Sequence, residues 1–183
     1  MEWMEMGLHL LVSGAAEDGK SSAFLDKVLQ IPRHPLTEAV IGLRLKLALG
    51  AKENDVAEVC ARRFMEEFPG SPKRPEALRA LAAAAWRVDP PKYRLVADLL
   101  TRLRELEKDA EEREKLSMQV ADCHFLAGDY GSAAALYTDL RTSAKNSIIA
   151  ERALTQAVNA SLATGDVEKT IRWMDETSRS GTL

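Results

Sequence analysis

Apolar residues recur every three or four positions along most of the chain, which is the spacing of one face of an α-helix. Val56, Val59, Cys60 and Phe64 follow this spacing in one stretch, and leucines follow it between residues 95 and 106. Glycine and proline separate these stretches, as expected where helices end or begin. The pattern predicts helices over residues 3–13, 20–30, 36–49, 54–68, 74–87, 92–107, 111–127, 130–144, 147–163 and 167–178.

The helix boundaries repeat at a nearly constant interval. Gly128 and Gly165, each followed by aspartate, are 37 residues apart, and so are Pro32 and Pro69. We expect these two glycines and Gly50 to end helices. A fixed interval of this size marks stacked helical hairpins, and five of them nearly fill the 183 residues. We therefore predict an all-α solenoid of about five antiparallel hairpins in a single domain, with units at residues 1–34, 35–72, 73–109, 110–146 and 147–183.

One unit carries a recognisable motif of small and aromatic residues around a turn. It consists of Ala121, Gly128-Asp129-Tyr130, Ala133, Ala134 and Tyr137. This stretch resembles the tetratricopeptide repeat (TPR) family, and Ala57, Ala61, Phe64 and Pro69 match the second half of the same motif. The resemblance implies a TPR-like right-handed superhelix. It also implies a non-enzymatic scaffold or adaptor for protein binding.

In TPR proteins the first helix of each hairpin lines a concave groove that receives the partner. Matching the motif to this sequence residue by residue gives the candidate groove residues, with a register that can shift by one position. They are Arg44 and Leu47 in the second unit, Lys115, Met118, Asp122 and Phe125 in the fourth, and Arg152, Thr155, Asn159 and Leu162 in the fifth. Met118 and Asp122 stand where one subset of the family has the lysine and asparagine that hold a terminal carboxylate, so we do not expect that mode of recognition.

Composition and charge narrow the class of partner. The chain has 27 Ala and 24 Leu but only 10 Val and 5 Ile, which favours helices over strands. Its 25 basic and 28 acidic residues are interspersed and give a net charge of −3. Binding to a nucleic-acid backbone needs a basic stripe, so we expect a protein or peptide partner and no nucleic acid. The longest mostly apolar run, residues 8–12, is far shorter than the roughly 20 residues of a membrane span, so none is expected.

A second interpretation concerns residues 14–21, which match the phosphate-binding pattern G-x-x-x-x-G-K-[ST] with Lys20 and Ser21 at its end. The alternative function is thus a P-loop nucleotide-binding protein. Two features oppose it. Glu17 and Asp18 would lie beside bound phosphates, and no later strand ends in the aspartate that a magnesium site needs. We favour a turn followed by a helix start.

Residues suited to metal binding or nucleophilic catalysis are dispersed. His34 and His124 lie far apart, and Cys60 and Cys123 have no CxxC spacing, so we expect no metal, cofactor or catalytic site. The cysteine usage and the acidic N-terminus favour a cytoplasmic location, or a periplasmic one if a signal peptide has been removed. Residues 68–72 are similar to linkers of bacterial envelope TPR proteins, which leaves an envelope assembly role as a further alternative. The last unit lacks a charged capping helix, so we expect a longer protein or self-association through this end.

Overall fold

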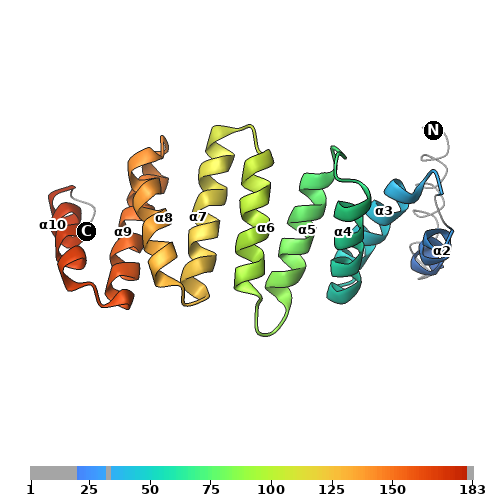
Figure 1. Cartoon of the computed structure of the whole chain (residues 1–183), viewed down its shortest axis with the longest axis horizontal. Helices are drawn as coiled ribbons and strands as arrows, with labels where there is room; N and C mark the ends of the chain where they lie inside the picture. Colours follow the sequence, from blue (N-terminus) through green and yellow to red (C-terminus); the bar gives the residue numbers. More distant parts are fainter. Residues whose placement is uncertain (1–19, 32–33, 181–183) are drawn as a thin grey trace. The chain divides into compact units, whose positions relative to one another are not determined.

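The computed structural model describes residues 20–31 and 34–180, and within these ranges it contains helices and turns but no strand (Figure 1). The helices are α2 (Lys20–Leu29), α3 (Thr37–Gly50), α4 (Asn54–Glu67), α5 (Arg74–Arg87), α6 (Tyr93–Leu106), α7 (Ala110–Leu126), α8 (Tyr130–Ser143), α9 (Ser147–Thr164) and α10 (Val167–Ser180). Each bound lies within two residues of the one predicted, so the all-α prediction is confirmed. The helix predicted over residues 3–13 lies outside the described residues, as do residues 14–19 of the phosphate-binding pattern.

These helices belong to two compact units, residues 1–89 and 90–183. In the first unit, α3 packs against α2, α4 and α5. In the second, α7 packs against α6, α8 and α9, and α9 also packs against α10. Contacts of α3 with α5 and of α7 with α9 are those expected when consecutive hairpins stack through their first helices. The third predicted hairpin, residues 73–109, contributes one helix to each unit, and a single continuous domain stays a prediction.

Small side chains form the core of the second unit. Ala121, Ala133, Ala153 and Ala157 are completely buried between α7, α8 and α9. Because alanine adds little bulk, these helices approach closely, and Tyr137, only 1% exposed, packs in the same cluster. The motif residues that resemble a TPR therefore act here as packing residues.

The turns of the second unit are fixed by local hydrogen bonds and by backbone conformation. Asp129 accepts a hydrogen bond from the backbone N–H of Ser132 at the start of α8, and Asn146 caps α9 in the same way. Gly128 and Gly165 have φ angles of 77° and 75°, the left-handed conformation that glycine adopts without strain. After α3 the left-handed position is Lys52, with φ 61°, and Gly50 instead forms the last residue of that helix.

Two Gly→Ala substitutions should change stability in opposite directions. Gly165→Ala places a Cβ on a left-handed residue and should lower the free energy of unfolding by about 1 kcal/mol. Gly42→Ala lies inside α3, where an added Cβ meets nothing within 4 Å, and should raise the free energy of unfolding by about 0.5–1 kcal/mol. Urea unfolding followed by circular dichroism measures both values. Changes of the same sign would contradict this account of the two positions.

Candidate functional site

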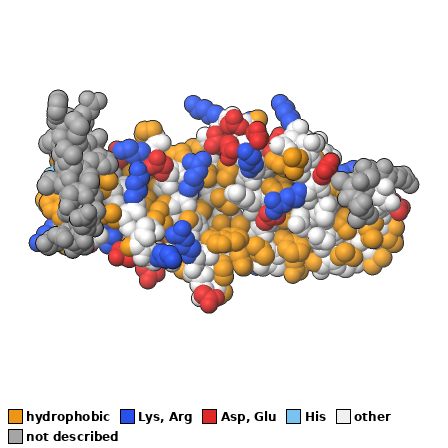
Figure 2. Space-filling view, turned by 180° about the vertical axis from the view of Figure 1, so that it is seen from behind, with side chains coloured by type: hydrophobic (Ala, Val, Ile, Leu, Met, Phe, Trp, Pro, Cys, Tyr) orange, Lys and Arg blue, Asp and Glu red, His pale blue; other side chains and the backbone are white. Residues whose placement is uncertain are grey.

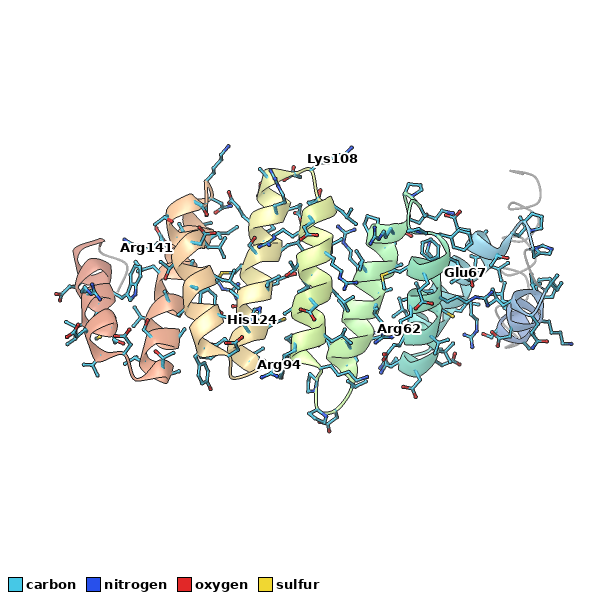
Figure 3. All side chains as sticks on the ribbon, viewed as in Figure 1. Arg62, Glu67, Arg94, Lys108, His124 and Arg141 are labelled. Atoms are coloured by element: carbon cyan, nitrogen blue, oxygen red, sulfur yellow. The ribbon has the colours of Figure 1, made fainter. Side chains whose placement is uncertain are left out.

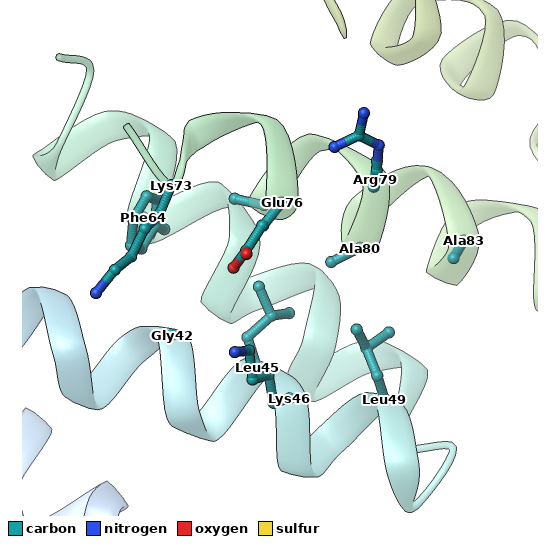
Figure 4. Close-up of a pocket in the computed structure, with 11 residues that line it drawn as sticks. Gly42, Leu45, Lys46, Leu49, Phe64, Lys73, Glu76, Arg79, Ala80 and Ala83 are labelled. Atoms are coloured by element: carbon teal, nitrogen blue, oxygen red, sulfur yellow. The ribbon is translucent and has the colours of Figure 1, made fainter. Parts of the chain in front are cut away.

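An open cavity of about 360 Å³ lies on the first unit between α3 and α5, and one residue of α4 also lines it (Figure 4). We call it the α3–α5 groove. Its lining residues come from one face of α3 and from the facing side of α5. They are Gly42, Leu45, Lys46, Leu49, Phe64, Lys73, Glu76, Ala77, Arg79, Ala80 and Ala83.

The floor of the groove is apolar. Leu45 and Leu49 lie one turn apart on α3, and the buried Phe64 ring of α4 also lines the groove. On the other side, α5 presents Ala77 and Ala80. Because these methyl groups are short, the space above them stays open to solvent although the two helices are in contact. A partner's apolar side chain could thus be buried here without displacing any residue of the chain.

Charged side chains surround this apolar floor. Lys46, Lys73 and Arg79 are exposed beside a single carboxylate, Glu76. Figure 4 shows Glu76 between α5 and α3, whereas Arg79 points away from α3. In the ranges that the structure describes, the ammonium groups of Lys46 and Lys73 have no ion-pair partner. The groove therefore carries a local excess of positive charge on a chain whose net charge is −3.

The neighbouring arginines of α4 differ from these lysines, because each is paired on its own helix. Arg62 contacts Glu58 at 2.8 Å and Arg63 contacts Glu67 at 2.6 Å, both at the i,i+4 spacing. Figure 3 labels Arg62 and Glu67, and Figure 2 shows acidic and basic side chains interspersed over the visible face. The charges of these two α4 arginines are thus balanced locally, unlike those of the two groove lysines.

The two residues predicted for this region, Arg44 and Leu47, do not line the groove. Arg44 is only 5% exposed and donates to Asp26 at 3.0 Å and to Glu53 at 2.9 Å. Burial lowers the pKa of Arg44, but its hydrogen bonds to Glu53 and Asp26 raise the pKa by more than burial lowers it. The pKa therefore lies above its ordinary value, and this arginine keeps its charge. Leu47 packs against the buried cluster around Leu25.

The α3–α5 groove thus lies on the face of α3 that carries Leu45 and Lys46, whereas Arg44 lines a second open cavity beside α4. Partner binding at Arg44 and Leu47 stays a prediction. Because α3 has apolar residues on every side, its sequence pattern cannot indicate which side is open.

In the second unit, two predicted residues from different helices meet. Arg152 of α9 donates from Nη2 to Oδ2 of Asp122 on α7 at 2.8 Å, and the Tyr137 hydroxyl of α8 donates to Oδ1 of Asp122 at 2.7 Å. Burial, together with the hydrogen bond to Asp122, raises the pKa of Tyr137. Asp122 thus provides the acceptor that a buried hydroxyl requires, and it joins three helices.

Met118 is 4% exposed and belongs to the core of the second unit, so it is removed from the candidate surface. Phe125 is half-buried and packs edge-on against Tyr130, with ring centroids 5.1 Å apart. Lys115 is exposed and contacts Glu111 and Glu112 on its own helix.

The three remaining candidates of α9 lie on its surface. The Thr155 hydroxyl donates to the backbone oxygen of Glu151, one turn earlier. Asn159 donates to the Gln156 side chain at 3.1 Å, and Leu162 is 58% exposed. These residues are accessible, and the side-chain hydrogen bonds to Glu151 and Gln156 stay within α9.

The last helix has an exposed apolar stripe formed by Val167, Ile171 and Met174. Its opposite side packs inward through Trp173, whose ring lies 4.5 Å from the guanidinium carbon of Arg141 on α8 (labelled in Figure 3). Self-association through this end of the chain stays a prediction.

The other chemical groups of the described ranges are held within the fold. No three His, Cys, Asp or Glu side chains in the described part of the chain are placed to hold a metal ion. Both cysteines are buried, and burial raises the pKa of Cys60 and raises that of Cys123 to about 11, which disfavours the reactive thiolate. Of the phosphate-binding pattern, only Lys20 and Ser21 are described, and they form the first turn of α2. Among the helices seen here, none has the length and apolar character to cross a lipid bilayer.

Solved structures similar to that of this chain are known. No protein-family model and no curated protein matches the chain. The structure of the nearly identical TPR-like repeats of a kinesin light chain from Podosopora anserina is similar, with a TM-score of 0.59, 13% identity and coverage of 95% of this chain and 93% of that one. The MamA protein is similar with a TM-score of 0.61 and 15% identity, over 100% of this chain and 98% of that one. At these identities the likeness shows the fold, which is a TPR-like helical repeat.

Removing the Asp122 carboxylate should cost more stability than removing the arginine that it binds. Asp122→Ala leaves the buried Tyr137 hydroxyl without its acceptor and should lower the free energy of unfolding by about 1–3 kcal/mol. The Arg152 side chain is 58% exposed, so Arg152→Ala should cost less than about 1 kcal/mol. Urea unfolding of the two variants tests this order. Equal losses would mean that the surface ion pair, and not the buried hydroxyl, explains the role of Asp122.

Alkaline pH should destabilise the second unit through Tyr137. In the folded protein the pKa of the Tyr137 phenol lies above its usual value of about 10, so the stability that the protonated phenol contributes is fully present below about pH 10. Above about pH 10 the phenol loses its proton in the unfolded chain before it does so in the folded protein. The free energy of unfolding therefore falls as pH rises, by up to about 1.4 kcal/mol per pH unit. Tyr137→Phe should therefore show a shallower loss between about pH 10 and 11.5 in urea unfolding. An equally steep loss in this variant would assign the alkaline transition to other groups.

Proposed function

From the TPR-like helical repeat fold, we propose that the chain is a non-enzymatic scaffold or adaptor that binds an extended peptide or a partner helix. The α3–α5 groove is the proposed site in the first unit. The observation that carries this proposal is an apolar floor, left open between the first helices of two consecutive hairpins and bordered by charged side chains.

The dimensions of the groove suit a segment of polypeptide. Its α3 side extends from Gly42 to Leu49, roughly 10 Å at the helical rise of 1.5 Å per residue. About three residues of an extended chain, or two turns of a helix, cover that length. Partner segments of this kind bind grooves by burying apolar anchors at regular spacing. The alanines of α5 leave room for such anchors.

For the second unit, taken by itself, a separate peptide-binding surface is proposed. Its accessible candidates are Lys115 on α7 and Thr155, Asn159 and Leu162 on α9. Asp122 and Arg152 lie on the same two helices, but their main contacts are with each other and with Tyr137. We therefore assign the peptide contacts of this unit to the four accessible residues.

Filling the groove should abolish peptide binding without unfolding the protein. An added Cβ at Gly42 meets nothing within 4 Å, so Gly42→Phe can place its ring in the cavity while α3 stays helical. Peptides selected from a random display library on the wild-type chain should lose at least about tenfold in affinity for this variant. Gly131→Phe is the matched control, because Gly131 lies in α8 outside the groove, an added Cβ there also meets nothing within 4 Å, and the change should alter affinity by less than about threefold.

The measurement is fluorescence anisotropy with the selected peptides, and circular dichroism checks that both variants fold. If the selected peptides bind Gly42→Phe as tightly as the wild type, the α3–α5 groove is not the binding site. A loss with both variants would mean that filling the groove is not what weakens binding.

A further inference from the structure

The glycine in the α3–α5 groove is not explained by the packing of the chain itself. Gly42 lies in the middle of α3, where glycine costs roughly 0.5–1 kcal/mol relative to alanine. Inside a helix, such a residue is usually needed because a neighbouring element approaches the backbone. A Cβ at this position would meet nothing within 4 Å, so the neighbouring residues of the described structure do not require a glycine here. The open space over the backbone remains available to a bound molecule.

The two groove lysines are likewise not used within the fold. Lys46 follows Gly42 by one helical turn, and Lys73 immediately precedes α5. Both are exposed, and within residues 34–180 neither ammonium group has an ion-pair partner. Exposed charges are normally well hydrated, so their presence alone means little. Here, however, both border an apolar cavity, where a ligand's carboxylate would be partly shielded from water and bound more strongly.

We propose that the α3–α5 groove selects an acidic amphipathic segment of a partner protein. One apolar side chain packs over Gly42 and against Leu45, and flanking carboxylates pair with Lys46 and Lys73. Glu76 disfavours a carboxylate in the centre of the groove, so the acidic residues lie on either side of the apolar one. This inference rests on the proposed function and adds the charge and the apolar content of the segment.

A polypeptide fits these features better than a small carboxylic acid does. The groove extends roughly 10 Å along α3, and its floor is apolar over that length. A small acid would pair with a lysine but would leave most of the floor exposed to water. A segment with an apolar side chain covers the floor and reaches both lysines, and each contact adds to the affinity.

Three labelled peptides of about twelve residues test the proposal by fluorescence anisotropy. The first has a central leucine flanked by glutamates, the second has lysines in place of the glutamates, and the third has alanine in place of the leucine. The first should bind at least about tenfold more tightly than the other two, and its affinity should fall as salt increases.

Charge reversal on the protein provides the matched comparison. Lys46→Glu/Lys73→Glu should weaken binding of the glutamate peptide by at least about tenfold and strengthen binding of the lysine peptide. Lys27→Glu/Arg87→Glu changes the net charge of the same unit equally, at exposed positions outside the groove, and should change affinity by less than about threefold.

The results separate this inference from the proposed function. If the two double variants weaken binding equally, the effect is one of overall charge and the proposed pairing is wrong. If the lysine or alanine peptide binds most tightly and Gly42→Phe blocks it, the groove binds peptides but the acidic amphipathic preference is wrong. If Gly42→Phe leaves the glutamate peptide bound, both proposals fail for this site. If glutarate displaces the peptide at concentrations equal to those of the peptide, the ligand of the groove is a small dicarboxylate and not a protein segment.

Discussion

The close approach of helices through alanine is the constraint on which the structure depends. In the second unit, five alanines without exposed surface allow α7, α8 and α9 to pack around the ring of Tyr137. In the first unit, Ala77 and Ala80 of α5 are also mostly buried, yet they form part of the groove floor. The same short side chain therefore builds a core where a third helix covers it and an open groove where none does. Core and groove differ in what lies above the alanines, not in the kind of residue used.

The helices could be predicted from the sequence to within two residues because their ends carry local signals. Asp129 and Asn146 cap the helices that follow them, and Gly165 takes the left-handed conformation after α9. The groove face of α3 could not be predicted in this way, since apolar residues surround that helix and no polar stripe indicates its orientation. The Gly42–Lys46 pair, a glycine and a cation one turn apart, was the available signal. Residues with a strong local preference were thus predicted correctly, whereas the orientation of α3 depends on its packing partners.

Motif positions also combine two roles that the sequence cannot separate. Met118 stands at a position that the TPR resemblance assigns to the groove, but it is buried in the core among residues of α7, α8 and α9. Asp122 faces outward enough to meet Arg152, yet its other oxygen binds the buried hydroxyl of Tyr137. A residue of this kind contributes to folding and to the surface at once, because one carboxylate has two oxygens with different surroundings. Changes in binding on substitution of Asp122 therefore have to be separated from changes in stability.

The division of the chain at residue 89 has an energetic consequence. Each unit has its own buried residues, so each has its own free energy of local opening. A molecule that occupies the α3–α5 groove adds its binding free energy to the folded state of the first unit. Amide hydrogens of α3 and α5 would then gain protection from exchange. Exchange rates at these two helices would thus report occupancy of the groove directly.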